Sequence, residues 1–206
     1  MIRDDLSDKL IHLTRGESDQ SAANNFLSIL QSKTLKGGTG CIKGKYQCVC
    51  FSEAPVGKLS YILANPSVHG MRYKPFGIMV SKEWLFLKGG RPVIYQPDEE
   101  YEFLHESQKF RHVRYEPNND VDFTWEREWR ILTSNLEIDP NCTTVVVPNR
   151  SWEEWFQNRH TAKLSRSAFA IGSIGPKSVS KQPWHFMVLE DLGVPVPSID
   201  PPKDEN

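Results

Sequence analysis

Along most of the chain, segments with the hydrophobic pattern of a strand alternate with segments whose apolar residues have the spacing of a helix. Short runs rich in β-branched and aromatic residues predict strands at residues 10–14, 48–52, 76–81, 92–95, 123–132, 143–147, 168–172 and 184–189. Apolar residues three and four positions apart predict helices at residues 21–32, 56–64, 82–87 and 98–110, and a further one around Trp152, Trp155 and Phe156. The strict strand–helix alternation of a doubly wound sheet is absent, so the pattern favours an α+β fold.

The most regular of these helices, at residues 21–32, has one apolar face. That face carries Ala22, Ala23, Phe26, Leu27 and Leu30. Asp19 or Ser21 can cap the start of the helix.

We expect one domain over residues 1–193, followed by a flexible tail at residues 194–206. A chain of 206 residues is within the range of a single domain. The tail sequence VPVPSIDPPKDEN is too rich in proline and polar residues to pack as regular structure.

The composition predicts a globular, cytoplasmic protein. Hydrophobic residues make up 38% of the chain and charged residues 25%, which is neither a disordered nor a collagen-like composition. The longest apolar stretches, such as Thr143 to Pro148, are far shorter than the ~20 residues that span a bilayer. The charged start MIRDDLSDK lacks the apolar core of a signal peptide, so we expect no membrane association.

Charge and cysteine spacing exclude several classes of site. The net charge of −1 lacks the basicity of a general nucleic-acid binder, although a local basic groove stays open. The spacing of Cys41, Cys48, Cys50 and Cys142 matches no usual zinc motif. We therefore expect reduced thiols and no metal site, the alternative being a site completed by a histidine. Neither a dinucleotide fingerprint nor a P-loop is present.

The segment from Asp122 to Ile131 has the highest density of chemical groups. If it is a strand, one face carries Thr124, Glu126, Glu128 and Arg130, and the other carries Trp125, Arg127, Trp129 and Ile131. Two carboxylates ~6.5 Å apart raise each other's pKa unless a cation such as Arg130 compensates. We expect buried tryptophans on the second face. A solvated strand face with one ion pair is the competing interpretation.

Other polar residues lie at the ends of predicted strands, and each also has a purely structural explanation. His12 shares a strand face with Thr14, and Arg15 ends that strand. Ser52 and Glu53 end the next strand, where they can face a cleft or form a turn. Tyr73 and Phe76 offer aromatic surfaces that core packing explains equally well.

The order of these motifs resembles the ADP-ribosyltransferase superfamily. The resemblance rests on Leu10 to Arg15, Phe26 to Leu35, Val49 to Pro55, Tyr73 to Val80 and Trp125 to Arg130. The first of these is similar to DNA-modifying toxins of toxin–antitoxin systems, and the Cys50 to Pro55 and Glu126 to Ile131 motifs are similar to bacterial abortive-infection relatives. The superfamily has a split, mixed or antiparallel sheet with short helices and a cleft for NAD.

The resemblance implies an NAD-dependent mono-ADP-ribosyltransferase, an enzyme of the glycosyltransferase class, serving as a phage-defence or toxin–antitoxin effector. The acceptor would be a nucleic acid or a protein, and an antitoxin or other protein would be the partner. Glu128 would stabilise the oxocarbenium-like transition state, and Glu126 would orient or deprotonate the acceptor. The cofactor-binding residues would be His12, Thr14, Arg15, Ser52, Tyr73 and Phe76. Ser52 would support Glu128, and Tyr73 or Phe76 would stack on nicotinamide. Because the chain has both His12 and Arg15, either can be the signature of the first strand.

Two other functions stay open. One is a non-catalytic member of the same fold that binds a nucleotide or a protein partner. The other is a metal-dependent nuclease in which carboxylates hold Mg²⁺, namely Asp120, Asp122, Glu126 and Glu128.

Overall fold

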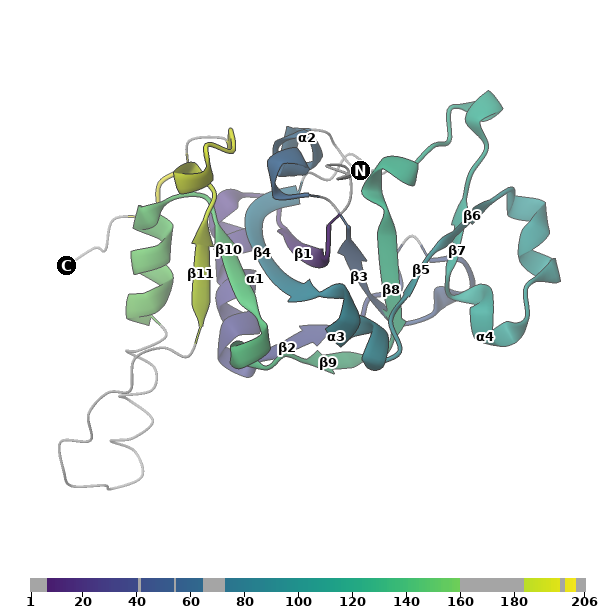
Figure 1. The fold of residues 1–206 in the computed structure, drawn as a ribbon, viewed down its shortest axis with the longest axis horizontal. Coiled ribbons are helices and arrows are strands. Elements are labelled where there is room, and N and C mark those ends of the chain that lie inside the picture. The colour runs from purple at the N-terminus through teal and green to yellow at the C-terminus, as the bar shows by residue number, and fades with distance from the viewer. Residues whose placement is uncertain are drawn as a thin grey trace, which may run out of the picture. The chain divides into compact units, whose positions relative to one another are not determined.

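The computed structural model describes residues 7–40, 42–53, 55–64, 73–159, 184–196 and 199–202. It has an α+β architecture with short helices, as the sequence pattern predicts (Figure 1). The predicted strand at residues 168–172 lies outside the described residues.

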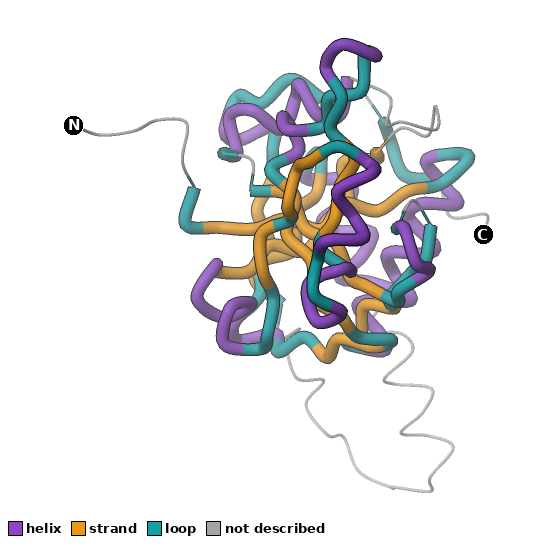
Figure 2. The backbone as a smooth tube through the Cα atoms, turned by 90° about the vertical axis from the view of Figure 1, so that its right-hand side faces the viewer, coloured by secondary structure: helices purple, strands orange, loops and turns teal. Residues whose placement is uncertain are grey.

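Seven strands form one sheet in the order β11-β10-β4-β1-β3-β8-β5. These strands are β1 (Lys9–Arg15), β3 (Cys48–Ser52), β4 (Tyr73–Ser81), β5 (Arg91–Pro92), β8 (Glu128–Leu132), β10 (Thr144–Val147) and β11 (His185–Val188). The β1–β3, β3–β8 and β5–β8 pairs are antiparallel, whereas β10 and β11 are parallel. The sheet is therefore mixed and mostly antiparallel (strands are orange in Figure 2).

Two smaller pairs of strands accompany the sheet. Strands β2 (Thr34–Lys36) and β9 (Asn135–Glu137) pair antiparallel, and β6 (Ile94–Gln96) and β7 (His112–Arg114) pair parallel. All four have only three residues, too few to give a visible period in the sequence.

The helices are short except for α1 (Asp19–Ser32). The others are α2 (Leu59–Ala64), α3 (Lys82–Leu87), α4 (Glu106–Lys109) and an unlabelled helix at residues 150–159. The 3₁₀ turns are η1 (Lys43–Lys45), η2 (Val56–Lys58), η3 (Asp98–Phe103), η4 (Pro117–Asn119), η5 (Thr124–Glu126), η6 (Pro140–Cys142) and η7 (Glu190–Leu192). The single helix predicted at residues 98–110 is therefore wrong, because η3 ends at Phe103 and His105 caps the separate helix α4.

Helix α1 forms where its apolar face predicts. Its buried residues are Ala22, Ala23, Phe26 and Leu30, all on the predicted face. The cap is Ser18 rather than Asp19 or Ser21. The Ser18 hydroxyl accepts from the Ser21 backbone, while the Ser21 hydroxyl accepts from the Ser18 backbone.

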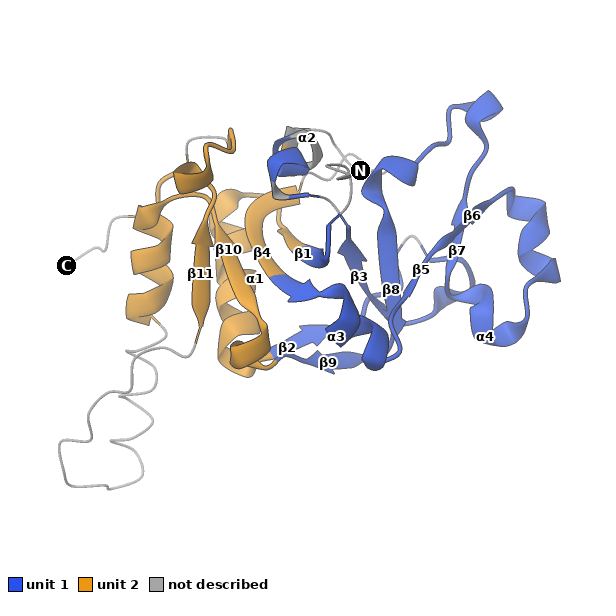
Figure 3. Cartoon of the chain, viewed as in Figure 1, with its two compact units in different colours: residues 1–12, 34–62, 79–138 blue, residues 13–33, 63–78, 139–206 orange. Residues whose placement is uncertain are grey.

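The chain divides into two compact units (Figure 3). Unit 1 contains residues 1–12, 34–62 and 79–138, and unit 2 contains residues 13–33, 63–78 and 139–206. Each is described below by itself.

Unit 2 has an aromatic core. The Phe76 ring lies 4.8 Å from Trp152 and 5.7 Å from Phe156, and Phe26 lies 5.3 Å from Phe156. The carbonyl of Ile199 accepts hydrogen bonds from the side chains of Trp152 (2.7 Å) and Asn149 (3.0 Å). The segment that was expected to be a flexible tail is therefore anchored at Ile199.

Candidate active site

The charged segment of unit 1 is only partly a strand. Residues Thr124 to Glu126 form η5, Arg127 has a left-handed backbone (φ 45°), and β8 begins at Glu128. Asp122 stabilises the turn, because its carboxylate accepts from the backbone (2.8 Å) and the hydroxyl (2.6 Å) of Thr124. The prediction of a strand from residue 123 is therefore wrong, and Glu126 does not follow the strand alternation that would align it with Glu128.

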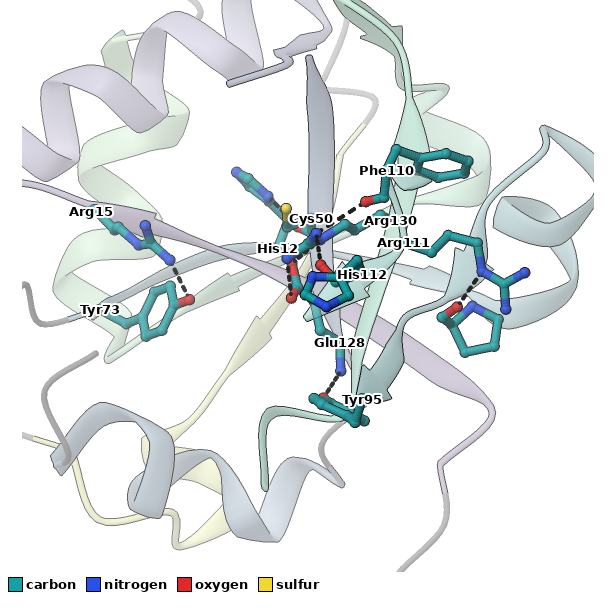
Figure 4. A network of polar contacts seen from close by, with 11 residues as sticks. His12, Arg15, Cys50, Tyr73, Tyr95, Phe110, Arg111, His112, Glu128 and Arg130 are labelled. Carbon is teal, nitrogen blue, oxygen red and sulfur yellow. Dashed lines mark hydrogen bonds and ion pairs between the residues drawn. The ribbon is translucent and has the colours of Figure 1, made fainter. Parts of the chain in front are cut away.

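Glu128 and Arg130 form a bidentate ion pair on one face of β8 (Figure 4). The Arg130 Nε donates to Glu128 Oε1 and the Arg130 Nη2 donates to Glu128 Oε2, both at 2.9 Å. The Glu128 side chain is 13% exposed and the Arg130 side chain is 4% exposed, so water screens the attraction between the two charges only a little. Arg130 is thus the compensating cation that the sequence predicts.

The backbone of the neighbouring segment completes the shell around Arg130. Its Nη1 donates to the carbonyls of Phe110 (3.0 Å) and His112 (2.9 Å). Burial alone would lower the pKa of Arg130, but the charge and hydrogen bonds of Glu128 raise it above its ordinary value. The guanidinium is therefore charged and held at all three nitrogens. The sequence gives no signal for these carbonyls, because they belong to a segment about twenty residues away.

Strand β3 places two further side chains on the face of Glu128 and Arg130. In the antiparallel register, Ser52 lies opposite Glu128 and Cys50 lies opposite Arg130, and opposite residues share a face. Burial raises the pKa of Cys50 well above its ordinary value, and the charge of Glu128 raises it further. Burial also raises the pKa of Cys48 to about 11. Both thiols are therefore protonated at neutral pH and are poor nucleophiles.

Ser52 contacts the carboxylate segment differently from the expectation. Its hydroxyl donates to the backbone carbonyl of Glu126, and the Glu53 backbone donates to the carbonyl of Arg127 (3.2 Å). Ser52 therefore ties the turn before β8 to the end of β3. Its hydrogen bond goes to this turn rather than to the Glu128 carboxylate.

Tyr95 adds a contact at the start of β8 that sequence reasoning missed. Its hydroxyl accepts from the Glu128 backbone at 3.1 Å, and burial raises the pKa of Tyr95 to about 12. The phenol therefore stays neutral and fixes the backbone of Glu128. An aromatic residue in a short strand carries no sequence signal for this role.

His12 lies on the other face of the sheet in unit 1. Ile11 pairs with Ser52, so alternation places His12 on the side of Phe51, whose ring is 5.8 Å away edge-on. The His12 Nδ1 is 2.8 Å from the carbonyl of Cys50. The register therefore places His12 on the face of the sheet opposite to that of Glu128, whereas the predicted NAD site includes both residues.

The face of Phe51 also carries Trp129 and a second ion pair. The indole of Trp129 donates to Glu53 (3.1 Å), whose other oxygen pairs with Lys82 (2.6 Å). Trp125 and Trp129 are half-buried, so the prediction that both tryptophans are buried is wrong. Glu53, 9% exposed, uses its carboxylate to hold this indole and this amine.

The remaining predicted residues lie in unit 2. The Arg15 guanidinium lies over the Tyr73 ring, 4.5 Å from its centre, and donates to the Tyr73 hydroxyl. Thr14 is 5% exposed, and its hydroxyl has no hydrogen-bond partner among the described residues. Phe76 is completely buried in the aromatic core, so it offers no surface for stacking on nicotinamide.

The described part of the chain was searched for metal-binding clusters and for membrane-spanning helices. No group of three or more histidine, cysteine, aspartate or glutamate side chains there is arranged to hold a metal ion. None of the helices in those ranges has the length and apolar character needed to cross a membrane.

The chain was also compared with known proteins. No family model, no curated protein and no solved structure matches it.

Proposed function

We propose that this protein is an NAD-dependent mono-ADP-ribosyltransferase in which Glu128 is the catalytic carboxylate. The observation that carries the proposal is the fixed orientation of Glu128, which Arg130, Tyr95 and the register with Ser52 hold in place. Electrostatic stabilisation of a cationic transition state requires a negative charge already oriented before the reaction.

The ion pair leaves acceptor capacity on Glu128. An ionised carboxylate has about four lone-pair sites, and the bidentate pair with Arg130 uses one on each oxygen. The remaining sites can accept ribose hydroxyls of NAD and lie close to the charge that develops on the ribose when the nicotinamide bond breaks. In this proposal, the Glu128 carboxylate therefore binds the ribose of NAD while Arg130 holds it in place.

Glu126 is the second carboxylate in the proposal. It lies in η5, immediately before β8, and Ser52 fixes its backbone carbonyl. A carboxylate on a turn beside the reacting sugar suits the binding of an acceptor hydroxyl or amine.

The acceptor in this proposal is a nucleic acid or a protein, and the cellular role is that of a defence or toxin–antitoxin effector in the cytoplasm. These parts rest on the resemblance of the motifs. Incubation of the protein with NAD labelled on the adenylate, together with a cell lysate, tests the proposal. A labelled macromolecule that forms equally well with EDTA supports a transferase. Metal-dependent cleavage of nucleic acid without label transfer would instead support the nuclease.

The same ion pair favours a second candidate, a non-catalytic binding protein. Both oxygens of Glu128 contact Arg130 and the side chain is 13% exposed, which also suits a structural role. Calorimetry with NAD, read together with the labelling experiment, separates the two candidates: a binding protein would bind NAD or a partner without transferring label, whereas a transferase would do both.

A further inference from the structure

Arg91 and Arg111 in unit 1 are two guanidinium groups held by neutral oxygens. The Arg91 Nη1 donates to the carbonyls of Phe86 (2.9 Å) and Gly90 (2.7 Å), and its guanidinium lies 3.9 Å from the centre of the Phe86 ring. The group is therefore fixed in orientation at the end of helix α3.

Arg111 is fixed against the same short stretch of backbone. Its Nε donates to the carbonyl of Pro92 at 2.8 Å (Figure 4). Its Nη1 donates to the side-chain oxygen of Gln108. Gly90 and Pro92 flank Arg91 in the sequence, so the carbonyls on either side of one residue orient both cations.

Neither cation is neutralised by an acid of the described ranges. Within the described ranges, no carboxylate forms an ion pair with Arg91 or Arg111, and the Nη2 group of each donates no hydrogen bond. Burial lowers the pKa of Arg111, and the charge of Arg91 lowers it further. Arg91 and Arg111 therefore repel each other, and a bound anion would relieve this repulsion.

We propose that Arg91 and Arg111 form a binding site for a phosphate group. Planar guanidinium groups bind phosphate with paired hydrogen bonds, and the fixed side chains lose little entropy when the ligand binds. Phe86, 49% exposed, lies beside the site and suits a phosphate that carries a flat ring. The site lies outside the group around Glu128 and does not depend on the transferase proposal.

Two ligands can supply the phosphate group that this site binds: free inorganic phosphate and the backbone of single-stranded nucleic acid. Fluorescence anisotropy with a labelled twelve-nucleotide oligothymidylate and calorimetry with inorganic phosphate, both on the full chain at low salt, distinguish them. We expect the R91Q/R111Q variant to lose about tenfold or more of its affinity for the ligand that binds, because both charged donors of the site are removed.

The matched control is K36Q/K58Q. Lys36 and Lys58 are exposed lysines of unit 1 whose side chains form no ion pair among the described residues, so this variant removes the same charge. We expect it to lose much less affinity. Equal losses in the two double variants, or no binding of either ligand by the wild type, would overturn the site.

A measurement on the wild type does not depend on how the variants fold. Phenylglyoxal modifies accessible arginines, and peptide mass spectrometry locates the products. We expect phosphate or the oligonucleotide to slow modification of Arg91 and Arg111 but not of the exposed Arg114. Equal slowing at all three would also contradict the proposal.

Discussion

The guanidinium of Arg130 binds both carboxylate oxygens of Glu128, two residues earlier on the same strand. Side chains two positions apart on a strand point to the same face, so this pair forms without any turn or helix. The pair fixes the orientation of the Glu128 carboxylate and ties β8 to the backbone at Phe110 and His112.

Replacement of Arg130 by methionine should strongly destabilise the fold. The change leaves the Glu128 carboxylate and two backbone carbonyls without their donor, and loss of one partner of a buried ion pair costs about 3–5 kcal/mol. Urea denaturation measures the free energy of unfolding. We expect the E128Q/R130M double variant to lose less than the sum of the single variants, because the two groups interact directly. Additive losses would show that the pair contributes no coupling.

His112 should make the stability of the protein depend on pH. It is 3% exposed and burial lowers its pKa, so the unfolded chain takes up a proton at a higher pH than the folded chain. The free energy of unfolding should therefore fall as the pH decreases from about 6.5, the ordinary histidine value, through the lower folded pKa.

The H112Q variant tests this dependence, since glutamine does not titrate. We expect the difference in unfolding free energy between pH 7 and pH 5 to be smaller in H112Q than in the wild type. An unchanged difference would assign the pH dependence to other groups.

Deletion of residues 197–206 should destabilise unit 2. The deletion removes the Ile199 carbonyl, so the buried indole of Trp152 and the amide of Asn149 lose their acceptor. An unsatisfied buried donor costs about 1–3 kcal/mol. Thermal unfolding measures the loss, and deletion of residues 203–206 alone is the matched control. Equal melting temperatures for the two truncations would contradict a stabilising role for the Ile199 contacts.

The cysteines should differ sharply in reactivity. Cys48 and Cys50 have raised pKa values through burial, whereas Cys142 is exposed. We expect iodoacetamide at pH 8 to modify Cys142 before Cys48 and Cys50, which should react only after denaturation. Mass spectrometry of the peptides follows each site. Rapid modification of Cys50 in the folded protein would contradict its raised pKa.

The sequence predicts best the elements that have a clear period or a cap. The strand at Cys48–Ser52 and the helix at Lys82–Leu87 have the predicted bounds, because the strand is a short run too β-prone for a helix and Gly89 and Gly90 follow the end of the helix. The strand at residues 123–132 was predicted too long, since the left-handed Arg127 has no sequence signal. The pairing of Glu128 with Arg130 follows from alternation, whereas the carbonyls of Phe110 and His112 depend on tertiary folding.

The most direct test of the central claim is transfer of labelled ADP-ribose by the wild type and the E128Q variant. Because E128Q also leaves Arg130 without its carboxylate, the comparison needs a control of similar stability. W129F is that control. It removes the hydrogen bond to Glu53 on the other face of β8 and keeps Glu128. Thermal unfolding curves of the wild type, E128Q and W129F identify a temperature at which all three proteins are folded, and the transfer rates are measured at that temperature.

We expect W129F to transfer label at close to the wild-type rate and E128Q to lose about 10²-fold or more, which is typical of the loss of one electrostatic stabiliser. Equal rates for E128Q and W129F, or no transfer of label by the wild type to any macromolecule, would contradict a catalytic role for Glu128.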